Sequence, residues 1–367
     1  MPWLCSVVIM QAWGQATAPP GLTLIKSSAF TTVKNQANTG TCWSFSTVSL
    51  IESQSIKNGI GEFDISEIFI VRNIYVEKAK NYILRQGKAQ FGEGGLGHDV
   101  IRAIATYGAV PESVYSGLIL GAKHHDHSAL ENKLRTYLDS LLQSRPVPSD
   151  WVKNYEAILD DHLGKVPENF RYGEKMYTPK SFASEVLHFN PDDYIDITSF
   201  THHPFYKPFI LEVPDNFLNG SYYNIPLNEM IALTEKAISS GYSIMWDADV
   251  SNSFFRQRDG YALQWKDKGA ISQPVSPDDL ERNFDQSMRQ SLFENLTTQD
   301  DHLMHLVGTE RSKGGKLFFL VKNSWGDTGP YKGFIHVSEA YFAVNTISLV
   351  IPRAVLDKSL RTKLGLP

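Results

Sequence analysis

Cys42 lies in the stretch NQANTGTCWSFS, directly after a Gly-Thr turn and before Trp43 and an amphipathic run. The chain has two cysteines, and the other one, Cys5, falls in an apolar segment at the start of the sequence. If that segment is removed, no disulfide can form and Cys42 is an unpaired thiol. A cysteine before a tryptophan is by itself more often buried packing than a nucleophile. This placement nevertheless indicates thiolate chemistry, because a helix N-terminus and an imidazolium both lower the pKa of a thiol.

The residues that follow Cys42 predict the helix that this chemistry requires. The apolar positions that recur at roughly helical spacing are Phe45, Val48, Ile51 and Ile56. They predict a helix from Thr41 to about Lys57 with the thiol in its first turn. A second helix is predicted after a cap at Asp64 or Ser66, and a third ends at Gly108.

The imidazole and its orienting group must come from distant segments. TTQDDHLMHLVG contains His302 and His305, and LVKNSWGDTG contains Asn323. A nucleophilic thiol needs a base that a third group holds in one tautomer, and an amide oxygen can accept the ring N–H without adding charge. If the first segment is a strand, its two histidines face opposite sides of the sheet, so only one of them can meet Cys42.

These segments together carry a resemblance to papain-type cysteine peptidases. In that family a Gln precedes the nucleophile by six positions, as Gln36 precedes Cys42. GEGGLGHDVIRAIATYGA resembles the family's Gly-Gly substrate-binding edge and the helix after it, and DDHLMHLVG and VKNSWG complete its order of Cys, His and Asn. The chain is more similar to the bleomycin hydrolase and bacterial aminopeptidase C branch. It has Thr39 where secreted papain-like enzymes have a disulfide cysteine, a long insertion after PESVYSG, and a continuation past its last strand.

The resemblance implies a role for each residue. Cys42 would be the nucleophile, and His302, six residues before Gly308, would be the base in preference to His305. Asn323 would orient the imidazole, and Gln36 would bind the oxyanion together with the backbone N–H of Cys42. The residues expected on the substrate-binding side are Gly94, Gly95, Asp301 and Trp325.

The order of helices and strands predicts an α+β fold, and the resemblance makes it papain-like, with a helical half, an antiparallel β half and a helical insertion. The predicted segments are a truncated signal peptide at 1–16, the helical half with the nucleophile at 17–116, the helical insertion at 117–222, the β half with His and Asn at 223–352, and a tail at 353–367. The tail could reach the cleft and block longer substrates, or it could form a short surface helix.

The resemblance implies an aminopeptidase that removes N-terminal residues from peptides, without a cofactor and within a homohexamer. The alternatives are a papain-like endopeptidase or acyl-transferase, or an inactive scaffold of the same fold. The net charge of −5, without a basic cluster, argues against nucleic acid as a partner. Trp3–Met10 is too short to span a membrane and precedes the small-x-small sequence Gly14-Gln15-Ala16. It predicts an exported protein, periplasmic or secreted, with the cytoplasm as the alternative.

Other histidines could suggest a metal, but the sequence predicts none. His302 and His305 spell H-x-x-H, a spacing that places two ligands on one face of a helix and not of a strand. His124–His127 and His202–His203 are interpreted as solvated loop histidines.

Overall fold

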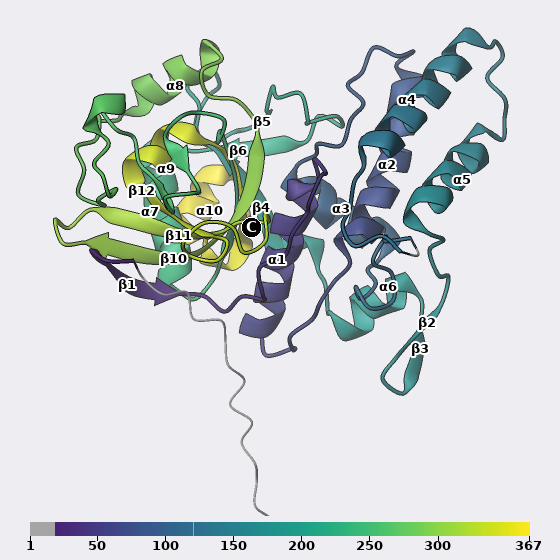
Figure 1. The fold of residues 1–367 in the computed structure, drawn as a ribbon, viewed down its shortest axis with the longest axis horizontal. Helices are drawn as coiled ribbons and strands as arrows, with labels where there is room; N and C mark the ends of the chain where they lie inside the picture. Colours follow the sequence, from purple (N-terminus) through teal and green to yellow (C-terminus); the bar gives the residue numbers. More distant parts are fainter. Residues whose placement is uncertain (1–18, 120) are drawn as a thin grey trace, which may run out of the picture.

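The structure is a computed structural model that describes residues 19–119 and 121–367. The predicted leader at 1–16 lies outside the described residues. Figure 1 shows two halves, with helices on one side and a large sheet on the other. The predicted α+β fold is confirmed.

The helical half is built on five longer helices. They are α1 (Cys42–Lys57), α2 (Glu67–Leu84), α3 (Gly97–Tyr107), α4 (Ser128–Gln143) and α5 (Trp151–Leu163). In α4 the buried residues are the leucines 130, 134, 138 and 141, which form one apolar stripe at helical spacing. α1 spans the predicted range, α3 ends directly before Gly108, and α2 begins after Ser66, whose hydroxyl caps it by accepting from the N–H of Phe69.

The sheet has eleven strands. In spatial order ten of them are β5 (Pro208–Ile210), β6 (Ser221–Asn224), β4 (Tyr194–Thr198), β13 (Thr346–Pro352), β7 (Ile244–Ala248), β10 (His302–Ser312), β11 (Leu317–Lys322), β12 (Phe334–Ser338), β9 (Tyr261–Ala262) and β8 (Phe255–Arg256). β1 (Leu22–Ser27) pairs with the second half of β10. Most neighbours are antiparallel, as predicted, but β4 and β6, and β9 and β12, are parallel pairs.

The segment 117–222 was predicted to be helical, but the structure shows both helices and strands in it. It contains α4 and α5, the short helix α6 (Pro179–Ser181) and a π-helix at Phe182–Val186, but also the hairpin of β2 (Phe170–Tyr172) and β3 (Lys175–Tyr177). Strands β4, β5 and β6 of this segment extend the large sheet. They are short and lie among Pro- and Asn-rich connections, so their alternation of apolar residues is weak in the sequence.

Four further helices pack around the sheet. They are α7 (Leu227–Ser239), α8 (Gln286–Glu294), α9 (Glu339–Asn345) and α10 (Lys358–Leu364). The run GFIHVSEAYF begins as strand β12 and changes to a helix at Ser338, whose hydroxyl caps α9 by accepting from the N–H of Tyr341. None of the described helices combines the length and apolar character that a membrane span requires.

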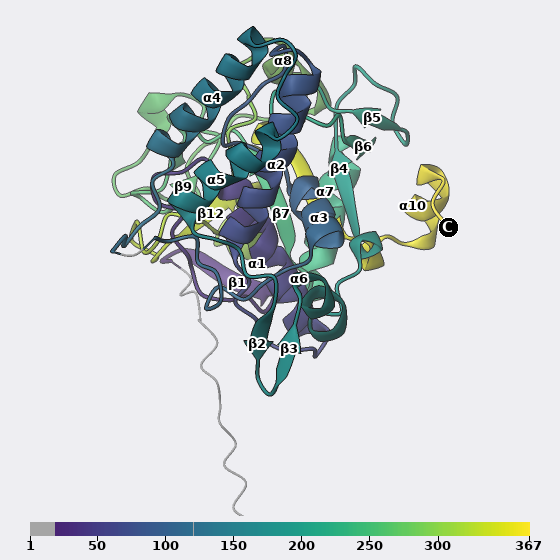
Figure 2. The ribbon, with the colours of Figure 1, turned by 90° about the vertical axis from the view of Figure 1, so that its right-hand side faces the viewer.

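The tail forms a surface helix. Leu360 and Leu364 of α10 are buried in the core on the sheet side, and Lys363 forms an ion pair with Glu229 of α7 at 2.9 Å. Figure 2 shows α10 at the edge of the molecule. Of the two possibilities that the sequence left open for residues 353–367, the structure therefore shows the surface helix.

The cap of α2 gives a stability test. Ser66→Ala removes the acceptor of the Phe69 N–H at a buried position, so we expect a loss of about 1 kcal/mol in the free energy of unfolding. Urea denaturation measures it. The matched control is Ser359→Ala, because Ser359 is an exposed serine of α10. An unchanged midpoint in Ser66→Ala would contradict the assigned cap.

Candidate active site

Cys42 is the first residue of α1, and its side chain is buried. The helix packs between the other helices and the sheet, against α2 and α3 on one side and β7 and β10 on the other (Figures 1 and 2). The backbone N–H of Leu303, the second residue of β10, donates to the thiol. The thiol therefore lies where the start of α1 meets the start of β10.

His302, the first residue of β10, is held on two sides. Its Nε2 lies 2.7 Å from Oδ1 of Asn323, and its ring stacks on that of Trp325 with centroids 4.6 Å apart. The Asn323 amide is itself fixed, because its Nδ2 donates to Oε1 of Gln257 at 3.1 Å. Asn323 Oδ1 must then accept, so His302 carries its proton on Nε2. Nδ1 is left as the nitrogen that can take a proton.

Gln36 is attached to the same loop as Asn323. Its backbone N–H donates to the carbonyl of Ser324 at 2.9 Å, and its Oε1 accepts from the Ser324 hydroxyl at 2.6 Å. Its Nε2 donates one hydrogen to the carbonyl of Thr39 at 2.7 Å. A side-chain amide has a second N–H, and the carboxamide is fixed in position to offer it.

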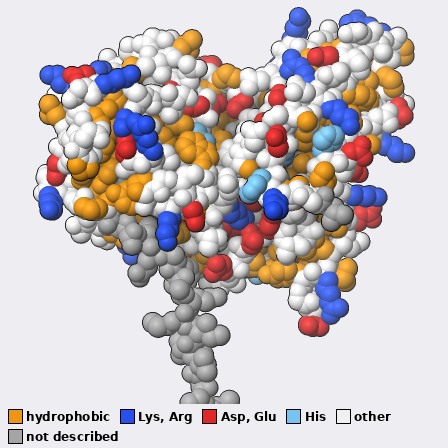
Figure 3. Space-filling view, in the orientation of Figure 1, with side chains coloured by type: hydrophobic (Ala, Val, Ile, Leu, Met, Phe, Trp, Pro, Cys, Tyr) orange, Lys and Arg blue, Asp and Glu red, His pale blue; other side chains and the backbone are white. Residues whose placement is uncertain are grey.

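One cleft of about 470 Å³ brings the predicted residues together. Among the residues that line it are Gln36, Cys42, Gly94, Gly95, Asp301, His302 and Trp325. Asn323 lies behind His302 and is 1 % exposed. Figure 3 shows a depression between the two halves of the molecule, with acidic side chains near its rim. All eight predicted site residues therefore converge on one region, although they come from four separate stretches of chain.

Both reacting groups are uncharged in this cleft. Burial raises the pKa of the Cys42 thiol to about 12; the Leu303 N–H opposes this change, and nearby carboxylates add to it. Burial lowers the pKa of His302 to about 4, although its hydrogen bond to Asn323 favours the charged ring. Both residues are described, and no hydrogen bond joins the thiol to the ring. A protonated thiol and a neutral imidazole therefore line the same cleft.

Neither of the two glycines that line the cleft has room for a side chain, and the neighbouring group that fills the space differs between them. A Cβ on Gly95 would come within 2.9 Å of the buried Trp43 ring. A Cβ on Gly94 would overlap the carboxylate of Asp215. Gly95 thus allows Trp43 to pack beneath it, and the space above Gly94 is occupied by an acidic side chain.

Asp301 orients a neighbouring loop. Its Oδ2 accepts from the N–H of Val250 at 3.0 Å and from the hydroxyl of Ser251 at 2.6 Å. Val250 and Ser251 both line the cleft. Asp301 therefore shapes one wall of the cleft.

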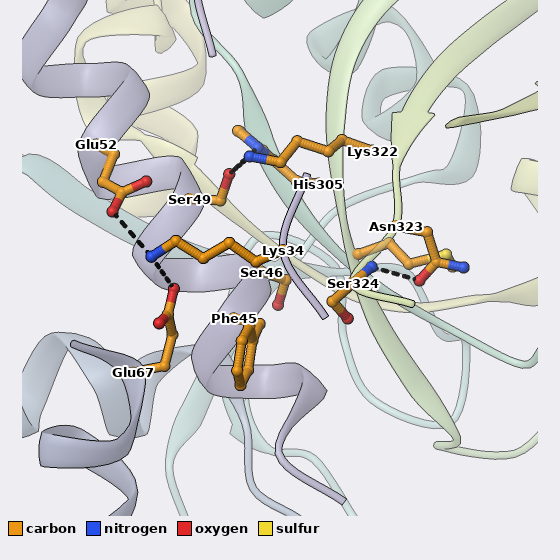
Figure 4. A pocket seen from close by; sticks show the side chains of 11 residues that line it. Lys34, Phe45, Ser46, Ser49, Glu52, Glu67, His305, Lys322, Asn323 and Ser324 are labelled. Carbon is orange, nitrogen blue, oxygen red and sulfur yellow. Dashed lines mark hydrogen bonds and ion pairs between the residues drawn. The ribbon is translucent and has the colours of Figure 1, made fainter. Parts of the chain in front are cut away.

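His305 points away from the cleft and into a buried polar cluster (Figure 4). Its Nδ1 lies 2.8 Å from the Ser49 hydroxyl of α1, which also accepts from Lys322 at 2.7 Å. Figure 4 also shows Lys34 between Glu52 and Glu67, with its Nζ 2.7 Å from Glu67. This cluster lies beside the cleft and connects α1, the sheet and the chain that leads to Gln36.

One group of described residues has the composition of a metal site. His202, His203 and Glu212 present donor atoms within 4.8 Å of one another, and both rings bond the carboxylate through Nε2. The group is partly exposed, and none of the three residues lines the cleft with Cys42.

Comparisons with known proteins agree with this geometry. The profile of the Peptidase C1-like family matches residues 165–365, more than half of the chain, and that of the papain family cysteine proteases matches residues 22–128. The chain belongs to the Peptidase C1-like family. The resemblance found in the sequence is therefore confirmed at the level of the family.

Several relatives of this peptidase family are similar along most of the chain. Aminopeptidase G of Lactobacillus delbrueckii subsp. lactis is 25 % identical over 89 % of this chain and 82 % of its own length. Aminopeptidase C of Streptococcus thermophilus is 24 % identical over 88 % and 81 %, and human bleomycin hydrolase 21 % identical over 88 % and 80 %. The crystal structure of PepW from Lactobacillus rhamnosis HN001 superposes with a TM-score of 0.72 at 20 % identity, covering 94 % of this chain and 84 % of that one.

Three residues of this C1-like site were not predicted from the sequence. Gln257 orients Asn323 and Asp215 covers Gly94, but both belong to loops without a recognisable motif. Ser324, which holds Gln36, follows Asn323 directly in the NSWG stretch. Only the position of Ser324 next to a predicted residue could have drawn attention to it.

The buried His302 predicts how stability changes with pH. The pKa of folded His302 is about 4 because of burial, whereas an unfolded histidine has a pKa of about 6.5, so the unfolded state binds a proton first. The contribution of His302 to the free energy of unfolding is fully present above about pH 6.5 and is lost as the pH falls toward 4. When the pH is lowered from 7 to 5, the proton uptake of His302 on unfolding is expected to lower the free energy of unfolding by about 2 kcal/mol.

Urea unfolding at both pH values tests this expectation. The free energy of unfolding of His302→Asn should fall less between pH 7 and pH 5 than that of the parent, by about 2 kcal/mol. The matched control is His188→Asn, because the side chain of His188 is exposed. Equal losses in His302→Asn and the parent would contradict a neutral buried His302.

Proposed function

We propose that this protein is a cysteine aminopeptidase that hydrolyses the N-terminal peptide bond through a thioester. The observation that carries the proposal is the orientation of His302. Its Nε2 is bound to Asn323, its ring is stacked on Trp325, and it shares one cleft with the only cysteine of the described residues. An imidazole held in this way is the base that an uncharged thiol requires.

The first half of the reaction forms the thioester. His302 Nδ1 takes the proton of the Cys42 thiol as sulfur bonds to the scissile carbonyl carbon. The carbonyl oxygen becomes an oxyanion that accepts from the Gln36 side chain and the backbone N–H of Cys42. When the intermediate collapses, the C–N bond breaks and the imidazolium returns its proton to the leaving amine.

The second half releases the acyl group. His302 takes a proton from water as the water oxygen attacks the thioester carbon. The oxyanion forms again at the same donors. The C–S bond then breaks, and the proton on the imidazolium returns to the Cys42 sulfur.

Two findings favour an exopeptidase over an endopeptidase or acyl-transferase. Asp215 covers the Gly94 end of the cleft, where a longer substrate would have to pass. The relatives that match most of the chain include aminopeptidases G and C. The homohexamer stays a prediction of the family resemblance.

A pair of substrates tests the direction of cleavage. An aminoacyl anilide with a free amine should be cleaved with a higher kcat/KM than the same anilide with an acetylated amine. Preferential cleavage of the acetylated anilide would favour an endopeptidase. If neither anilide is cleaved and a thiol-directed peptide epoxide forms no adduct with Cys42, the protein is an inactive scaffold.

Single substitutions test the assigned roles. Cys42→Ala should remove activity, because no other side chain in the cleft can form the thioester. Gln36→Ala removes one oxyanion donor and should lower kcat about 10²- to 10³-fold with little change in KM. Steady-state kinetics measures both. A kcat within about threefold of the parent in Gln36→Ala would contradict its role at the oxyanion.

A further inference from the structure

Asp215 stands in the cleft at the position where a substrate backbone along Gly94 would continue. Its Oδ2 occupies the space in which a Gly94 side chain would begin. It lines the same cavity as Cys42 and His302. An extended chain bound along the two glycines would therefore end against this carboxylate.

The loop that carries Asp215, between β5 and β6, is firmly built. Asn216 bridges it by donating to the carbonyls of Leu211 and Gly220, both at 2.9 Å, and by accepting from the N–H of Gly220. Phe217 is buried in the core of the helical half. Asp215 is thus held in place by its neighbours, without help from a substrate.

The Asp215 carboxylate forms no ion pair within 4.0 Å among the described residues, and the cation that acts on it most strongly is Lys78. Its Oδ1 accepts from the neutral amide of Gln90 at 2.8 Å. Lys78 donates its hydrogen bonds to the carbonyls of Gly92 and Gly94, and its charge only opposes the rise that burial causes in the pKa of Asp215. A carboxylate that lines a cleft and is hydrogen-bonded to no cation can bind one.

A second, buried carboxylate points to the same ligand charge. Asp300 lines the cleft and lies against Asp247 of β7, which is completely buried. Asp247 Oδ2 accepts from the Ser348 hydroxyl at 2.9 Å, but its Oδ1 has no partner. Burial, together with the neighbouring carboxylates, raises the pKa of Asp300 to about 7. Asp300 is therefore partly protonated near neutral pH, and a cation bound beside it would favour its ionised form.

The geometry suits an ammonium better than a metal ion. Within the part of the chain that the structure describes, the only group of three metal-ligating side chains with donor atoms within 4.8 Å is His202, His203 and Glu212, outside this cleft. An ammonium has three N–H donors and needs only one or two carboxylate oxygens.

We propose that Asp215, with Asp300 behind it, binds the free α-ammonium group of the peptide substrate and closes the cleft beyond it. This inference rests on the proposed aminopeptidase function and gives that function its specificity. No residue of 353–367 lines the cleft, because α10 is packed on α7. The anchor therefore comes from the loop between β5 and β6.

The anchor has a consequence for the nucleophile. Asp300 and Asp215 are among the carboxylates that hold the pKa of Cys42 up, after burial itself. A bound ammonium offsets their charge and so makes ionisation of the thiol easier. The ammonium group of a substrate should thus improve both the binding of that substrate and the attack by the Cys42 thiolate.

The test compares Asp215→Asn with the parent on two substrates. One is leucyl anilide, and the other is its des-amino analogue, 4-methylpentanoyl anilide, which has the same shape without the amine. We expect the parent to prefer leucyl anilide. Asp215→Asn should lose about 10- to 100-fold in kcat/KM for leucyl anilide and change little with the analogue. The matched control is Asp161→Asn, an exposed aspartate of α5.

The outcomes separate this inference from the function on which it rests. If the parent does not prefer the free amine, the aminopeptidase itself is contradicted. If the parent prefers it and Asp215→Asn keeps the same preference, only the anchor is overturned. Titration of Cys42 with a thiol-directed peptide epoxide measures the folded active fraction. An equal loss with both substrates at full titration would also overturn the anchor, because it would show a role that does not depend on the amine.

Discussion

The site depends on the contact between α1 and β10. The two elements run in the same sense, and two pairs of residues join them: Cys42 with Leu303, and Ser49 with His305. Seven residues of helix rise about 10 Å, and two to three residues of strand span about 7 to 10 Å, so both contacts can form together. Because His305 faces α1 at one end of this contact, the alternation of the strand turns His302 toward the cleft.

The buried polar cluster keeps the other parts of the site in register with that contact. Lys34 is bound to Glu67, and Lys322 donates to the carbonyl of Thr31 at 2.7 Å. The chain from Thr31 to Gln36 is thereby attached to both the helices and the sheet. Paired charges of this kind add little to stability, but removing one partner is costly, which favours a single arrangement. The position of the oxyanion donor follows from that arrangement.

The electrostatics of the cleft distinguish this molecule from a preformed thiolate–imidazolium pair. Burial and the surrounding carboxylates keep the proton on Cys42, and burial keeps His302 neutral. Asp215 and Asp300, which line the same cleft, form no ion pair among the described residues, and burial raises the pKa of both. A cationic substrate would complete the charge balance, so recognition of the amine and activation of the thiol become one electrostatic event.

The sequence by itself determined the local features: the helix at Cys42, the cap at Ser66, the main strands, and the Gln, Cys, His and Asn spacing from which the family could be recognised. These follow from short-range periodicity and from motifs whose residues lie close together in the chain. Only the tertiary structure decided that β4, β5 and β6 join the sheet, that α10 packs on α7, and that Asp215 and Gln257 reach the site. Their positions depend on packing between distant segments, and no local pattern in the sequence records which loop will meet which helix.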